Sequence, residues 1–67
     1  MQNDVKKHIT IRVNDDKEVL TIGNYIHKQL MGKPDYIENR VILNIDSPNE
    51  VNVYIFEDCE EDITLNI

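Results

Sequence analysis

The sequence predicts a small α+β domain in which one helix packs on a mostly antiparallel four-stranded sheet. Three patterns lead to this fold class: period-two alternation near the N-terminus, helical spacing of apolar residues in the middle, and renewed alternation in the C-terminal half. The 67 residues suffice for a single domain over 1–67. The hydrophobic fraction of 40% is too high for a disordered acidic tail, so the chain is expected to fold.

The first expected element is a strand over residues 8–13, where β-branched apolar residues alternate with polar ones. A helix is expected over residues 16–31, because apolar residues there recur at i, i+3, i+7 and i+11 and form one stripe. Asp15, with Glu18 three residues later, has the form of a capping box at its start.

Two glycines and a proline shape this helix. Gly23 lies in the apolar stripe, where it costs about 1 kcal/mol against Ala but allows close approach to a sheet. Gly32 and Pro34 are typical of a helix end. A second interpretation makes residues 18–22 a strand and only residues 24–31 helical, which gives a ββαβββ, β-grasp-like order. The long helix is favoured.

The C-terminal half is expected to form a three-stranded antiparallel meander. Residues 32–39 form a loop, and alternation then predicts strands over 40–46, 51–56 and 63–67. Together with the first strand this gives the order βαβββ. The expected core takes apolar residues from every element: Ile9, Ile11, Val13, Val19, Ile22, Ile26, Leu30, Val41, Leu43, Ile45, Val51, Val53, Ile55, Ile63 and Leu65.

One helix covers only one face of such a sheet, and the other face is predicted to carry an apolar patch. Alternation places Ile42, Tyr54 and Phe56 there among polar residues. Tyr and Phe are common interface anchors, while cross-strand packing would also account for them. The interface interpretation gives a structural or regulatory homo-oligomer, for instance a homodimer, that pairs through this face or through the edge of residues 63–67.

Charge is divided unevenly along the chain, whose net charge is −6. Residues 1–40 hold all 7 basic and 6 acidic residues, a net charge of +1. Residues 41–67 hold 7 acidic residues and no Lys or Arg: Asp46, Glu50, Glu57, Asp58, Glu60, Glu61 and Asp62. This balance disfavours direct binding to nucleic acid or anionic membranes and favours a cationic protein partner.

Carboxylates fixed on structured elements can imitate phosphates and occupy the basic surface of a nucleic-acid-binding protein. The combination of short length, acidity and a compact α+β fold resembles the general profile of small acidic inhibitors from bacteriophages, and no motif assigns functional residues. The first hypothesis is therefore a DNA mimic that inhibits a host protein. The candidate partner-binding residues are the seven carboxylates of residues 41–67 together with Ile42, Tyr54 and Phe56. Plain solubility is the competing explanation.

No catalytic motif accompanies these features, so no enzymatic activity and no cofactor are expected. His8 and His27 are expected to be exposed, and no Cys/His zinc spacing occurs. The acidic run at residues 57–62 lacks the glycine and ligand spacing of a calcium loop, so no metal is expected there.

Cys59 is the single cysteine and cannot form an intramolecular disulfide. Acidic neighbours should raise the pKa of its thiol, which argues against a nucleophile. The first seven residues lack an apolar signal core, and no window is long and apolar enough for a transmembrane span. A reducing, cytoplasmic location is the simplest expectation.

Overall fold

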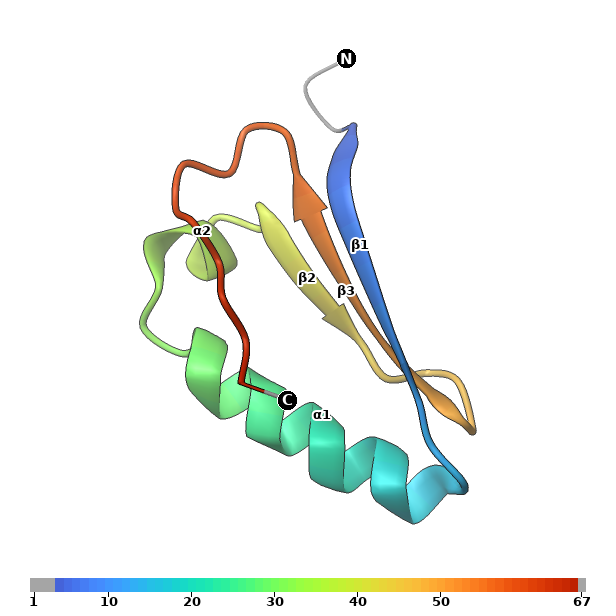
Figure 1. Cartoon of the computed structure of the whole chain (residues 1–67). Coiled ribbons are helices and arrows are strands. Elements are labelled where there is room, and N and C mark those ends of the chain that lie inside the picture. Colours follow the sequence, from blue (N-terminus) through green and yellow to red (C-terminus); the bar gives the residue numbers. More distant parts are fainter. Residues whose placement is uncertain (1–3, 67) are drawn as a thin grey trace.

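The computed structural model describes residues 4–66. Its elements, in chain order, are β1 (Val5–Arg12), α1 (Asp16–Leu30), α2 (Pro34–Ile37), β2 (Val41–Asn44) and β3 (Glu50–Phe56). The strands form one antiparallel sheet of order β1-β3-β2, so β3 is central. Figure 1 shows α1, α2 and the C-terminal segment on the same side of this sheet, which gives the domain two layers.

The prediction of a fourth strand at residues 63–67 is wrong for the part that the structure describes. Residues 63–66 have no strand structure, and residue 67 lies outside the described range. The central strand β3 already has a neighbour on each side, because β1 takes the place that the meander assigned to the last segment. The C-terminal segment instead returns over the helical layer, and Thr64 and Asn66 are not part of the outer sheet face.

A glutamine side chain supplies the hydrogen bonds that a neighbouring strand would otherwise offer to this segment. Gln29 of α1 donates from Nε2 to the carbonyl oxygen of Asn66 over 3.1 Å. The backbone N–H of Asn66 donates back to Gln29 Oε1 over 2.8 Å. Ile63 of the same segment is buried in the core, so the segment still belongs to it.

The single long helix is confirmed, and the split interpretation is wrong because α1 runs without interruption. Asp15 is the N-cap, and its Oδ1 accepts a hydrogen bond from the backbone N–H of Glu18 over 2.9 Å. The Glu18 side chain accepts from Asn14 Nδ2 over 3.1 Å, outside the reciprocal pattern of a capping box. Gly32 has φ of 84°, as a residue after a helix C-cap commonly does.

The loop expected at residues 32–39 contains the short helix α2. The first helix ends at Leu30, before Pro34, and Pro34 occupies the first turn of the second, where its missing N–H and fixed φ are tolerated. Asn39 then adopts φ of 61°, a left-handed conformation that Asn tolerates well, and turns the chain into β2. The proline expected as a stop signal for the first helix therefore begins the second helix.

The core contains every residue that the alternation and the helical stripe predicted, either buried or half-buried. Cys59 and Tyr36 join it without having been predicted. Gly23 is buried, and a Cβ added there would lie 2.7 Å from Cγ2 of Ile45, the residue that follows β2. The helix therefore approaches the end of β2 at a distance that only glycine permits without movement of Ile45.

Candidate functional site

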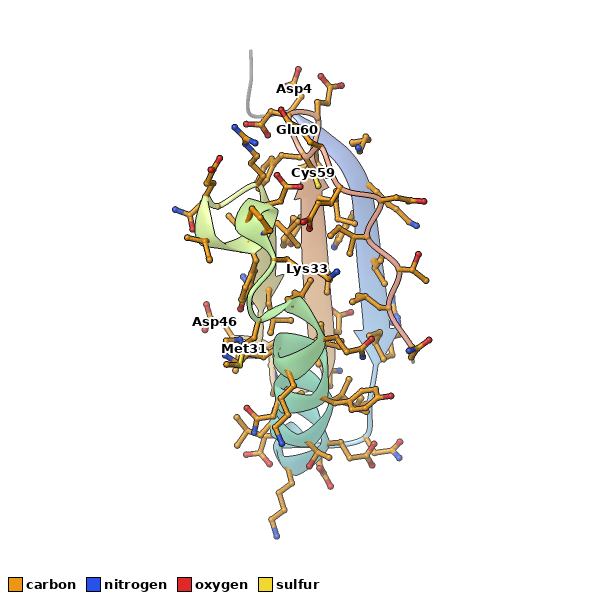
Figure 2. All side chains as sticks on the ribbon, turned by 90° about the vertical axis from the view of Figure 1, so that its left-hand side faces the viewer. Asp4, Met31, Lys33, Asp46, Cys59 and Glu60 are labelled. Atoms are coloured by element: carbon orange, nitrogen blue, oxygen red, sulfur yellow. The ribbon has the colours of Figure 1, made fainter. Side chains whose placement is uncertain are left out.

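The acidic residues of the C-terminal half lie at two ends of the sheet. Asp46 and Glu50 flank the turn that joins β2 to β3, whereas residues 57–62 follow the opposite end of β3. The 7 residues of β3 separate these groups by about 20 Å. Figure 2 shows Glu60 at one end of the domain and Asp46 much farther along it. The structure thus brings five of the seven candidate carboxylates together on one segment, which we call the acidic loop (residues 57–62).

The backbone of the acidic loop is held by Asp35, a buried carboxylate of α2 that is only 2% exposed. Its Oδ2 accepts hydrogen bonds from the backbone N–H groups of Glu60 over 3.1 Å and Glu61 over 2.7 Å. The thiol of Cys59 donates to the same oxygen over 3.4 Å. Three consecutive residues therefore converge on one carboxylate oxygen, and the loop conformation depends on it.

Arg40 joins the same carboxylate to the surface of the loop. Its Nη1 lies 3.3 Å from Asp35 Oδ1, its Nη2 lies 3.0 Å from Glu38 Oε2, and its Nε lies 3.6 Å from Asp58 Oδ2. The backbone N–H of Arg40 also donates to the carbonyl oxygen of Asp35 over 2.7 Å. A single guanidinium thus ties α2, the start of β2 and the acidic loop together.

These contacts shift the pKa values of Asp35 and Arg40 in opposite directions. The backbone hydrogen bond from Glu61 is the main cause that lowers the pKa of Asp35, with Cys59 and Arg40 adding to it against the effect of burial. The hydrogen bond to Asp35 is likewise the main cause that raises the pKa of Arg40. At neutral pH this part of the domain therefore contains a charged carboxylate and a charged guanidinium.

The thiol of Cys59 has a raised pKa, as the sequence predicted. The main cause is burial, since Cys59 is 6% exposed, and the hydrogen bond and charge of Asp35 add to it. The acidic neighbours in the sequence were the expected cause, but the carboxylate that acts on the thiol lies 24 residues away. Cys59 is therefore a buried thiol donor in the core.

A hollow of about 200 Å³ lies between β1 and the acidic loop. Its lining combines two lysines of β1, three acidic residues of the loop and two apolar residues: Lys6, Lys7, Ile55, Glu60, Glu61, Asp62 and Ile63. Its volume is below that of typical small-molecule pockets. Glu61 points one carboxylate oxygen, Oε2, into the protein, and that oxygen has no hydrogen-bond partner among the described residues. Glu61 is therefore the least accessible carboxylate of the acidic loop.

The outer face of the sheet carries the predicted apolar residues in register. Tyr54 lies between His8 of β1 and Ile42 of β2, and its ring stacks on His8 with centroids 4.4 Å apart. Phe56 lies opposite Val5, at the end of β3 that leads into the acidic loop. The two parts of the candidate partner-binding surface therefore adjoin at Phe56.

Sequence reasoning missed Asp35 and Arg40, the two residues that organise the acidic loop. Asp35 follows a proline in a segment read as a loop, and its partners lie 24 to 26 residues away. The available signal was Arg40, the last basic residue before the acidic half of the chain. The two histidines, by contrast, are exposed as expected.

The fold and this site define a small two-layer α+β domain with a carboxylate-anchored acidic loop. No family model, curated protein or solved structure matches this chain. Within residues 4–66, no helix is long and apolar enough to cross a membrane. The same residues contain no group of three or more His, Cys, Asp or Glu side chains arranged to hold a metal ion.

Proposed function

We propose that this domain is a non-enzymatic inhibitor that places its acidic loop on the basic surface of a nucleic-acid-binding protein. The observation that carries this proposal is the anchoring of the loop by Asp35. A loop fixed before binding loses less conformational entropy when it meets a partner than a flexible acidic tail would. It also fixes the backbone positions from which its carboxylates extend.

Four of the five carboxylates of the acidic loop support this role because their side chains are exposed: Glu57, Asp58, Glu60 and Asp62. Arg40 offsets part of this charge at Asp58, and Lys6 and Lys7 of β1 offset part of it where they line the hollow beside the loop, although no basic residue lies within the loop itself. The resulting negative end would steer a cationic surface toward the domain and speed association. Phe56, half-buried beside the loop, would add apolar contact.

The acidic residues are divided between two ends of the sheet, which limits how many of them can contact one partner at the same time. Asp46 and Glu50 lie about 20 Å from the loop, at 3.3 Å per strand residue. They can contact the same partner only if its basic surface extends along the whole sheet. The acidic loop is therefore the proposed primary contact, and binding should weaken with rising salt because it replaces a phosphate contact.

The experiment compares two variants with the same net charge. The loop variant carries Glu57→Gln, Glu60→Gln and Asp62→Asn, which leaves Asp35, Arg40 and Glu61 untouched. The control variant carries Asp16→Asn, Glu18→Gln and Asn24→Lys, which changes the net charge by the same amount at exposed positions of α1, outside the candidate partner-binding residues. Each immobilised protein is used for capture from a cell lysate at low and high salt, followed by competition with duplex DNA.

The proposal predicts that the wild type and the control variant retain the same nucleic-acid-binding protein at low salt. The loop variant should lose it, and duplex DNA should displace it from the wild type. Equal retention by the loop variant and the control would mean that the acidic loop is not the contact. Capture that DNA does not reverse would contradict occupation of a nucleic-acid site.

A further inference from the structure

The two flanks of α1 differ in what covers them. On one flank, Gln29 holds the C-terminal segment through its two hydrogen bonds with Asn66. Leu20 and Met31 lie about 180° away around the helix, because successive residues of an α-helix are about 100° apart. They remain 55% and 61% exposed. We call this side of the helix the open flank, which consists of four exposed residues at spacing i, i+4, i+7 and i+11: Leu20, Asn24, His27 and Met31.

The charged residues at the two ends of α1 are opposite in sign. Residues 15–18 hold three acidic residues and one lysine, a net charge of −2, whereas residues 27–33 hold two lysines and no acidic residue, a net charge of +2. None of these side chains forms a salt bridge within the part of the chain that the structure describes. This charge pattern favours an antiparallel neighbouring helix, whose acidic end would lie beside the basic end of α1, and the helix dipoles favour the same orientation.

We propose that the open flank packs on the open flank of a second copy, with the two α1 helices antiparallel about a two-fold axis midway between Asn24 and His27. This register places Leu20 of each copy against Met31 of the other, and Asn24 against His27. The Nδ1 atom of His27 already bonds to the Tyr36 hydroxyl over 2.7 Å, so its Nε2 is the atom left to bond the Asn24 amide.

Other arrangements of the two helices match the open flank less well. A shift of one helical turn in one direction would set Leu20 against His27 of the second copy. The opposite shift would set Met31 against Asn24. Each shift pairs an apolar residue with a polar one, and a parallel arrangement would bring ends of like charge together.

The contact is small and leaves the acidic loop free. The open flank is one helix wide, so the interface falls in the class below about 1,200 Å², which is typical of weak, concentration-dependent association. Figure 1 shows the segment that follows β3 at the opposite end of the domain from the start of α1. Pairing through α1 uses no residue of the acidic loop, so it holds whether or not that loop binds the proposed partner.

The first test measures mass against concentration by sedimentation equilibrium. Leu20→Lys removes an apolar contact and sets a positive charge against the basic end of the second helix. Tyr25→Lys is the matched control, because Tyr25 is 49% exposed on a different side of the same helix. Both variants should stay folded by circular dichroism, since lysine is a good helix former at exposed positions.

The wild type and Tyr25→Lys should form dimers as concentration rises, whereas Leu20→Lys should associate about tenfold or more weakly. A wild type that remains monomeric would overturn the proposal. So would a Leu20→Lys protein that dimerises like the wild type, or an equal loss of association in Tyr25→Lys.

The second test uses the wild-type chain and reports the register. Within one molecule, Leu20 and Met31 are about 16 Å apart along α1, at 1.5 Å per residue, which is too far for a nuclear Overhauser effect between their methyl groups. Antiparallel pairing predicts this effect between labelled and unlabelled copies at concentrations where the dimer forms. A dimer that lacks it would overturn the proposal. A dimer that Tyr54→Ala dissociates would also overturn it and would assign association to the outer sheet face.

Discussion

Asp35 and Glu61 are joined by a 2.7 Å hydrogen bond from the Glu61 backbone N–H to the Asp35 carboxylate, across 26 residues of sequence. The contact turns a run of acidic residues into a loop with a defined backbone. It also places a buried negative charge beneath exposed negative charges, which is tolerated because backbone N–H groups and Arg40 surround it.

Asp35→Asn should destabilise the domain strongly. The amide keeps the shape of the carboxylate but loses its charge, and its NH2 end must face either the loop N–H groups or Arg40, both of which are donors. We expect Tm to fall by about 10 °C or more, a large effect for a domain of this size. The matched control is Asp62→Asn, an exposed carboxylate of the same loop. Thermal melts that coincide for the two variants would contradict the anchoring role.

Acid should weaken the domain through the same carboxylate. The folded state lowers the pKa of Asp35, so the unfolded chain takes up a proton first as pH falls. The stabilisation from Asp35 is therefore fully present above the ordinary carboxyl pKa of about 4 and is lost as pH falls below it. Urea unfolding from pH 7 to pH 2 should show this loss in the wild type. The free energy of unfolding of Asp35→Asn should depend less on pH. An equal pH dependence in both proteins would count against this role of Asp35.

Gly23→Ala should destabilise the domain although Ala is the better helix former. The added Cβ would lie 2.7 Å from Ile45 Cγ2, a branch atom that cannot move without the whole side chain. Overpacking of this kind costs about 1–3 kcal/mol, against a gain of about 1 kcal/mol in helix propensity. Urea unfolding should therefore show a net loss of about 1 kcal/mol, an estimate from the same two effects.

The control for this prediction is Asn24→Ala at the next residue of α1. Asn24 is exposed, so this substitution should only raise helix propensity and thereby stability. Placed in an Ile45→Ala background, Gly23→Ala should lose its cost, because the clashing methyl is gone. A loss of stability that persists in this double variant would mean that Gly23 is required for a reason other than Ile45.

The thiol of Cys59 should react slowly in the native protein. Burial and Asp35 raise its pKa, so little thiolate is present near neutral pH, and reagents reach it only when the loop opens. Reaction with a thiol reagent should be about tenfold or more slower than in the urea-unfolded chain. Asp35→Asn should speed the reaction of the native protein by releasing the loop. Native and unfolded rates that agree would show that the thiol is not protected.

Much of the fold follows from local patterns in the sequence. Alternation along β1, β2 and β3 and the apolar stripe of α1 identify the core residues, because burial on one face of a strand or helix imposes a period that short stretches reveal. The end of α1 was likewise marked by Gly32, since its positive φ is a local requirement. The exposed state of His8 and His27 also follows from their positions on these elements.

The tertiary structure alone decided how the strands are arranged and what the acidic segment rests on. Residues 63–66 alternate like a strand, yet β1 and β2 already occupy both sides of β3, and Gln29 takes the hydrogen bonds instead. The sequence by itself determined that the negative charge belongs to the C-terminal half. Only folding divided it between two ends of the sheet and placed Asp35 beneath one of them, because that carboxylate finds its partners through contacts distant in sequence.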